Sequence, residues 1–183
     1  GTVLIILVTL SVLSFGYDDQ LLFTLSLTLL SLTLGLFLFN FPFGKIFLGD
    51  GGSYFLGFCL AIFVVMLSER NEFLSPFASL LVVLYPFYEL VRSFLRRIHR
   101  GLNSTINPDL EHFHSLVFKL MKKKSKLKFI NTNAQASLVC IFFTVFNCMW
   151  VIYFSEDKLV LIIGIASFIC IYELAYFLLK RRT

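Results

Sequence analysis

Residues 21–39 read LLFTLSLTLLSLTLGLFLF, an apolar run without a charged side chain. A helix of about 20 such residues crosses the roughly 30 Å hydrocarbon core of a bilayer, where no water satisfies backbone groups. Three more predominantly apolar runs have comparable length, and two shorter ones complete the pattern: 73–95, 134–154, 159–179, 2–15 and 54–67. The sequence therefore predicts an all-α integral membrane protein with about six transmembrane helices.

Composition supports this class. Hydrophobic residues make up 58% of the 183, and the mean hydropathy is +0.86. Soluble domains are nearer half apolar and spread these residues at helical or strand period. We expect one transmembrane domain over 1–183 with a cytoplasmic loop at about 96–133. Because the chain begins at Gly1 rather than Met, we expect it to be the C-terminal part of a larger polytopic helical bundle.

Lysine and arginine are distributed very unevenly between the loops. Counted over alternate loops of six helices, fourteen fall on one side and two, Arg70 and Lys158, on the other. The side richer in Lys and Arg faces the cytoplasm. Both chain ends and both polar loops, 41–53 and 96–133, are therefore predicted on the cytoplasmic side of a plasma membrane. The basic residues are explained as topology signals and contacts with anionic lipid, so nucleic acid is not expected as a partner.

The first polar loop, 41–53, reads FPFGKIFLGDGGS and directly precedes an apolar segment. One interpretation is structural, with Asp50 or Ser53 capping the start of a helix. The other is chemical, with Asp50 holding Mg²⁺ and a diphosphate. Mg²⁺ favours one or two carboxylates plus substrate phosphates, and glycines beside a helix N-terminus let the backbone approach an anion.

The second loop contains NPDLEHFHS at 107–115. His112 and His114 are two residues apart, so they share a face only where the backbone is extended or irregular. A zinc pair on a helix would be spaced i and i+4, which disfavours zinc here. Two imidazoles beside Asp109 and Glu111 could instead donate to a phosphate or a sugar, and an ordinary solvated loop is the alternative.

Glu89 is an ionisable residue inside an apolar run, three residues after Pro86, a proline that is expected to kink its helix. Such groups are costly in a membrane and are usually paired. We expect its partner to be Arg92 or Arg96, one or two helical turns further on.

Four motifs occur in a recognisable order: FLGDGGS at 47–53, Pro-x-x-Glu at 86–89, Arg-Arg at 96–97 and PDLEHFH at 108–114. This arrangement resembles the C-terminal half of the polyprenyl-phosphate N-acetylhexosamine-1-phosphate transferases, glycosyltransferase family 4. The resemblance implies transfer of sugar 1-phosphate from a UDP-N-acetylhexosamine to polyprenyl (undecaprenyl) phosphate, with release of UMP. It also implies Mg²⁺ and a cytoplasmic active face in a bacterial inner membrane, at the start of a cell-envelope glycan.

Roles carried over from the family fall on matching positions only. Asp50 would bind Mg²⁺, and His112 and His114 would contact the diphosphate or the sugar. The expected substrate-binding positions are Phe47, where the uracil would stack, with Gly49, Ser53 and Asp109. Membrane lipids are further expected partners, and a homodimer is retained as a candidate assembly.

The chain also departs from the family pattern. The family's Asp-Asp motif and its Asn-x-x-Asn…Asp-Gly segment lie upstream of the matched region, so we expect residues 1–183 alone to be inactive. Asp18 and Asp19 are not a substitute, because the charge count places them on the external side. Ser115 replaces a histidine of many relatives. Two alternatives stay open: a non-catalytic or degenerate membrane relative, and a transporter, which would have polar residues near the bilayer midplane.

Overall fold

The computed structural model describes residues 1–42, 44–46, 48–100, 112–124 and 132–182. No strand occurs in these ranges. The helices, in chain order, are α1 (Thr2–Gly16), α2 (Gln20–Asn40), α3 (Gly49–Arg70), α4 (Pro76–Val82), α5 (Leu84–Arg100), α6 (Phe113–Lys124), α7 (Thr132–Phe154) and α8 (Lys158–Arg182).

Each predicted apolar run forms a helix, but the number of spans is four or five rather than six. The helices α2, α3, α7 and α8 are long and apolar enough to cross a membrane, and α4 with α5 would make a fifth span if the bent pair counts as one. The helix α1 has 15 residues and is therefore about 22 Å long, which is short for the hydrocarbon core. The chain is an all-α integral membrane protein.

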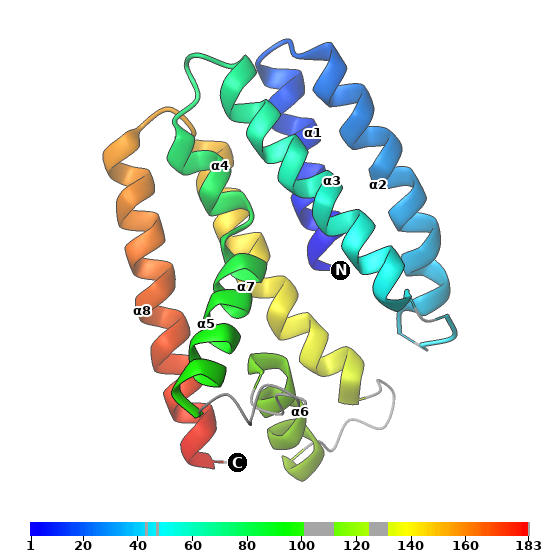
Figure 1. Cartoon of the computed structure of the whole chain (residues 1–183), viewed down its shortest axis with the longest axis vertical. Coiled ribbons are helices and arrows are strands. Elements are labelled where there is room, and N and C mark those ends of the chain that lie inside the picture. Colours follow the sequence, from blue (N-terminus) through cyan, green and yellow to red (C-terminus); the bar gives the residue numbers. More distant parts are fainter. Residues whose placement is uncertain (43, 47, 101–111, 125–131, 183) are drawn as a thin grey trace.

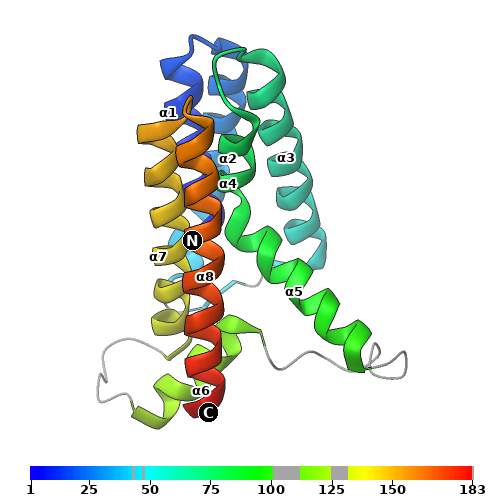
Figure 2. The ribbon, with the colours of Figure 1, turned by 90° about the vertical axis from the view of Figure 1, so that its left-hand side faces the viewer.

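The run 73–95, predicted as one span that Pro86 kinks, forms two helices in the structure. Between α4 and α5 the helix axis bends by 71°. Pro86 explains the position, because a proline has no N–H for the carbonyl four residues earlier and its ring clashes with that carbonyl. That carbonyl belongs to Val82, the last residue of α4. Figure 2 shows α5 leaning away from α7 and α8 as a result.

The core lies where α1, α4, α7 and α8 meet, and α1 also packs along α2 (Figure 1). Leu7, Leu10, Leu81 and Leu161 are fully buried there. Large apolar side chains are exposed on the outer surfaces of the bundle, among them Leu32, Phe58, Phe142 and Leu174. Such a surface suits contact with lipid or with other apolar helices.

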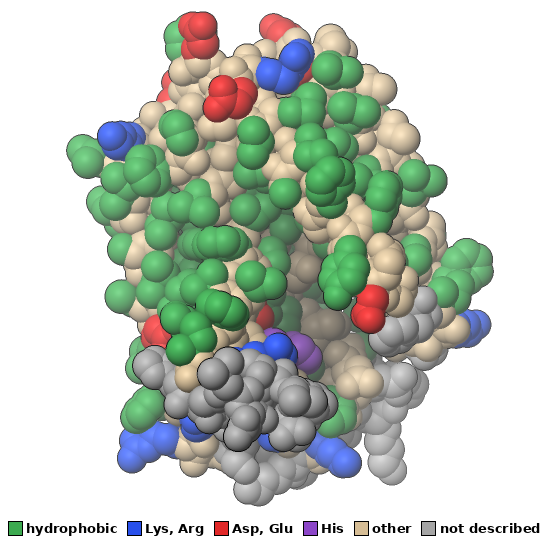
Figure 3. Space-filling view, in the orientation of Figure 1, with side chains coloured by type: hydrophobic (Ala, Val, Ile, Leu, Met, Phe, Trp, Pro, Cys, Tyr) green, Lys and Arg blue, Asp and Glu red, His purple; other side chains and the backbone are tan. Residues whose placement is uncertain are grey.

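Charge is separated between the two ends of the bundle. At the end where α1, α3 and α7 finish, here called the acidic end, lie Asp18, Asp19, Glu69, Glu72, Glu156 and Asp157. The opposite end, here called the basic end, contains α6 and the C-terminus of α8, and Figure 3 shows most Lys and Arg side chains there. The predicted separation of the loops is thus confirmed for the described residues: Lys45, Arg92, Arg96, Arg97, Lys119, Lys122, Lys180, Arg181 and Arg182.

Candidate active site

The first turn of α3 lies at the basic end and contains Asp50. Gly49 begins the helix with φ +70°, a backbone conformation that favours glycine. Leu48 occupies the N-cap position and makes no side-chain cap hydrogen bond. The Ser53 hydroxyl donates to the backbone carbonyl of Asp50 at 2.9 Å.

The structural interpretation of this loop, a capping Asp50 or Ser53, is therefore wrong. Asp50 is exposed, and its carboxylate has no hydrogen-bond or ion-pair partner among the residues that the structure describes. The donor groups of the first turn of α3 are likewise not satisfied by a side chain of the N-cap residue. Together they provide a free carboxylate and a helix N-terminus side by side, which can accept a cation and an anion respectively.

The two histidines lie at the start of α6, also at the basic end. The His112 carbonyl accepts the Leu116 N–H at 3.0 Å, so His112 sits in the cap position just before the helix, and His114 is in the first turn. Their rings stack, with centroids 5.5 Å apart and planes inclined by 18°. The prediction that they share a face only through irregular backbone is confirmed.

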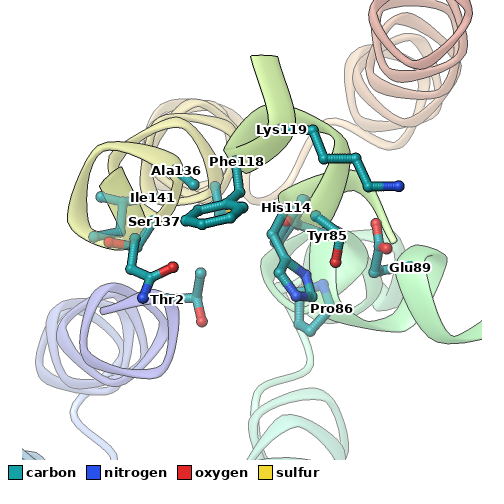
Figure 4. Close-up of a pocket in the computed structure, with 13 residues that line it drawn as sticks. Thr2, Tyr85, Pro86, Glu89, His114, Phe118, Lys119, Ala136, Ser137 and Ile141 are labelled. Atoms are coloured by element: carbon teal, nitrogen blue, oxygen red, sulfur yellow. The ribbon is translucent and has the colours of Figure 1, made fainter. Parts of the chain in front are cut away.

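His114 lines a cavity of about 790 Å³ between α1, α5, α6 and α7. In Figure 4 Thr2, Ser137 and Ile141 lie on one side of the cavity, and Pro86, Glu89 and His114 on the other. The polar groups around it also include Lys119 and Asn133. Although His114 is open to the cavity, burial by surrounding protein atoms, followed by the neighbouring His112, holds the pKa of His114 below its usual value.

Among the described residues, the contacts of Glu89 are with His112, Phe113 and Tyr172 rather than with Arg92 or Arg96, contrary to the expectation. Its Oε1 accepts a hydrogen bond from His112 Nδ1 at 3.1 Å and from the backbone N–H of Phe113 at 2.9 Å. Its Oε2 accepts a hydrogen bond from the Tyr172 hydroxyl of α8. One carboxylate on α5 therefore joins the start of α6 to α8. Arg92 instead pairs with a different carboxylate, which lies on α8.

That second carboxylate is Glu173. It accepts hydrogen bonds from Arg92 and from the Tyr88 hydroxyl, the latter at 2.7 Å. The Arg92 guanidinium also lies over the Tyr176 ring, 3.8 Å from its centroid. These contacts tie α5 to α8 beside the Glu89 site without involving a histidine.

Asp18 and Asp19 lie at the acidic end, away from both histidines and Asp50, which supports excluding them from the site. Asp19 caps α2 and pairs with Arg70. Its role in the structure is that of a helix cap and ion-pair partner.

The described residues bring some predicted site residues together and not others. His112 and His114 stack, whereas no hydrogen bond or ion pair joins Asp50 to either ring. In the same ranges, no group of three His, Cys, Asp or Glu side chains is arranged to hold a metal. Phe47 and Asp109 lie outside the described residues.

Sequence reasoning missed the tie between Glu89 and His112. A carboxylate in an apolar run needs a partner, but spacing along one helix indicates only cations on that helix, such as Arg92 and Arg96. His112 is 23 residues away and became a neighbour only through the bend at α5 and the packing of α6 against α7 and α8. The sequence did not indicate that Tyr172 contacts Glu89, because nothing in its pattern distinguishes this tyrosine from the others in apolar helices.

Residues 1–68 match the sequence model of the family described as Glycosyl transferase family 4. A Bacillus subtilis protein named as a probable undecaprenyl-phosphate N-acetylglucosaminyl 1-phosphate transferase is 31% identical over 130 residues, 69% of this chain and 36% of the relative. An undecaprenyl-phosphate alpha-N-acetylglucosaminyl 1-phosphate transferase of Haemophilus influenzae is 32% identical over 83 residues, 43% of this chain and 23% of the relative.

The protein of the same name from Escherichia coli K12 is 29% identical over 76 residues, 41% of this chain and 20% of the relative. The chain thus matches little more than a third of the Bacillus relative and a smaller share of the other two. No solved structure matches it. With the motif order and the paired histidines, these matches establish that the chain belongs to glycosyl transferase family 4.

Proposed function

We propose that this chain is part of a multi-pass enzyme that transfers N-acetylhexosamine 1-phosphate from a UDP-sugar to undecaprenyl phosphate. The observation that carries the proposal is the placement of a free Asp50 carboxylate and a stacked histidine pair at one end of a membrane bundle whose relatives are named for this transfer. The basic end is the cytoplasmic face of a bacterial inner membrane by the positive-inside rule.

The bonds that change are at a phosphorus atom. A phosphate oxygen of the lipid attacks the phosphorus bonded to the sugar, and the bond from that phosphorus to the bridging oxygen breaks. UMP leaves with that oxygen, and the lipid keeps a diphosphate-linked sugar. Protein groups contribute mainly by positioning the reactants and by neutralising charge in such a transfer.

Asp50 has the chemistry expected of a Mg²⁺ ligand. It is an exposed carboxylate without a partner among the described residues, beside glycines that leave space for a phosphate. Mg²⁺ is usually bound by one or two carboxylates together with substrate phosphates, and Asp50 can supply one such carboxylate. The ion, when bound, neutralises charge on the diphosphate.

The other groups of this chain act on the same diphosphate and sugar. Backbone N–H groups in the first turn of α3 are available to donate to a phosphate oxygen, and Ser53 lies in that turn. His112 and His114 donate to the diphosphate or the sugar from the start of α6. Phe47 and Asp109 complete the proposed substrate contacts, with Phe47 stacking on the uracil.

The test uses membranes that contain the gene product bearing these residues. They are incubated with undecaprenyl phosphate, Mg²⁺ and UDP-N-acetylglucosamine or UDP-N-acetylgalactosamine labelled in the sugar. The proposal expects label in the lipid together with free UMP. Release of UDP instead would mean transfer of the sugar without its phosphate, and the proposed reaction would then be wrong. The matched control is the Asp50→Asn variant at the same expression level.

A further inference from the structure

Glu89 accepts two hydrogen bonds from the start of α6 and a third from α8. Oε1 binds both the His112 ring and the Phe113 backbone N–H, and Oε2 binds Tyr172. The Glu89 side chain is only 14% exposed, and Phe113 and Tyr172 are almost fully buried. Hydrogen bonds from α6 and α8 therefore fix the position of the Glu89 carboxylate, which can in turn orient the His112 ring.

The contact with Glu89 determines which nitrogen of the His112 ring carries a proton. A carboxylate only accepts hydrogen bonds, so the proton of the shared bond is on Nδ1. The other ring nitrogen, Nε2, is left for a second partner, either as an acceptor in the neutral ring or as a donor in the imidazolium. A hydrogen bond at one ring nitrogen is the usual way in which a protein orients a reactive or ligating histidine.

Glu173 is a second carboxylate in the same region, and it also joins α5 to α8. It too receives a tyrosine hydroxyl and lies between α5 and α8, but its second partner is Arg92, which lies against Tyr176. Glu89 is the one of these two neighbours that contacts a histidine. Glu173 thus joins helices only, whereas Glu89 joins helices and also contacts a histidine.

From these contacts we infer that Glu89 is a positioning residue. It anchors the start of α6 to α5 and α8, fixes the Nδ1–H form of His112, and presents Nε2 to the substrate diphosphate or sugar. The expected effect of Glu89 on turnover rests on the proposed function. The anchoring itself can be measured without turnover.

The kinetic experiment compares Glu89→Gln with Glu173→Gln in the gene product that contains this chain. Glu89→Gln is expected to lower kcat by about 10- to 100-fold while KM for the UDP-sugar changes by less than about threefold, as when an interaction with a charged group is lost in the transition state. Glu173→Gln removes a neighbouring carboxylate that also joins α5 to α8, and should leave kcat within about threefold. Glu89→Asp, which keeps the charge, should recover part of the lost kcat.

A double-mutant cycle tests whether Glu89 acts through His112. In a His112→Gln background, Glu89→Gln should cause less than about a twofold further loss, because the group that it orients is already gone. If the fold loss in kcat of the double variant equals the product of the two single losses, Glu89 acts independently of His112 and the inference is overturned.

Hydrogen exchange supplies a readout that needs no substrate and remains usable if His112→Gln has no measurable rate. Peptides covering 112–118 should exchange faster in Glu89→Ala than in wild type, because the Phe113 N–H loses its acceptor, and should be unchanged in Glu173→Gln. Unchanged exchange in Glu89→Ala would overturn the anchoring. Absence of turnover in wild type would contradict the proposed function, while the exchange result would still decide the anchoring.

Discussion

Arg70, the last residue of α3, forms a two-point ion pair with Asp19, the residue that caps α2. Arg70 Nε donates to Oδ2 at 2.8 Å, and its second nitrogen donates to Oδ1 at 3.0 Å. The Leu22 N–H also donates to Oδ1, at 3.2 Å. One carboxylate, 3% exposed, therefore fastens the α1–α2 turn to the end of α3 at the acidic end.

Replacing Asp19 should lower stability and leave the rate per folded molecule unchanged. Asp19→Ala removes both the cap and the ion pair, and should cost about 1–2 kcal/mol in the free energy of unfolding. Asp19→Asn keeps most of the cap and should cost less. Thermal unfolding in detergent measures both. Asp18→Asn is the matched control, because Asp18 is exposed at φ +57°, a conformation that asparagine tolerates.

The same pair should make stability acid-sensitive. Hydrogen bonds from Arg70, and more weakly from Leu22, hold the pKa of Asp19 below its usual value. A carboxyl with a depressed pKa stabilises the folded state at neutral pH, and the contribution is lost as pH falls below about 4. The difference in thermal midpoint between wild type and Asp19→Asn should be constant from pH 7 to about 5 and shrink below about 4. A difference that does not change with pH would contradict this role.

The separation of charge predicts opposite accessibility for cysteines at the two ends. In a background where the four native cysteines are alanine, Glu72→Cys and Lys158→Cys should react with an impermeant maleimide in intact cells. Lys45→Cys and Lys122→Cys should react only after permeabilisation, because the basic end faces the cytoplasm. Labelling of Lys122→Cys in intact cells would show that the basic end faces outward. It would contradict both the assigned orientation and the proposed cytoplasmic site.

The sequence predicted the helices well because the membrane imposes one strong constraint. A run of apolar residues such as 21–39 has no alternative to a helix in hydrocarbon, and the structure confirms each run. The number of spans was harder to predict: 2–15 was included although it is shorter than the other runs, and its helix α1 has 15 residues. The kink expected from Pro86 is confirmed, because the structure bends by 71° between α4 and α5.

The site was predictable only in part. Asp50, His112 and His114 were singled out by motif, and the structure adds that Asp50 is free of a capping role and that the rings stack. Contacts across helices, such as Glu89 with His112, depend on packing between distant segments. Hydropathy and spacing carry no information about such pairs, so they could not be predicted from the sequence.

His114 should make stability fall at mildly acidic pH. Its pKa is lowered mainly by burial, so the folded state favours the neutral ring and the unfolded state takes up the proton first. The resulting contribution is present above the unfolded pKa of about 6.5 and is lost as pH falls below it. The drop in thermal midpoint between pH 7.5 and 5.5 should be smaller in His114→Gln than in wild type. Asp19→Asn, which acts at lower pH, should show the wild-type drop.

Asp50 offers the sharpest test of the metal assignment, because its side chain caps no helix within the described part of the chain. Both Asp50→Asn and Asp50→Ala should keep the thermal midpoint close to that of wild type in the absence of Mg²⁺ and substrate. Both should lose most of the transfer rate, since an amide or a methyl group is a poor ligand for a hard dication. Rate measured against Mg²⁺ concentration, with thermal unfolding of the same preparations, gives both quantities.

A true cap elsewhere in the chain provides the opposite pattern as a control. Asp157 accepts hydrogen bonds from the Leu159 and Val160 N–H groups at 3.0 and 3.2 Å and so caps α8 at the acidic end. Asp157→Ala should therefore lower stability by about 1 kcal/mol and leave the rate per folded molecule and its Mg²⁺ dependence unchanged. If Asp50→Ala instead behaves like Asp157→Ala, Asp50 is a structural residue. The metal would then have to be held elsewhere, because no other carboxylate among the described residues lies in the first turn of α3.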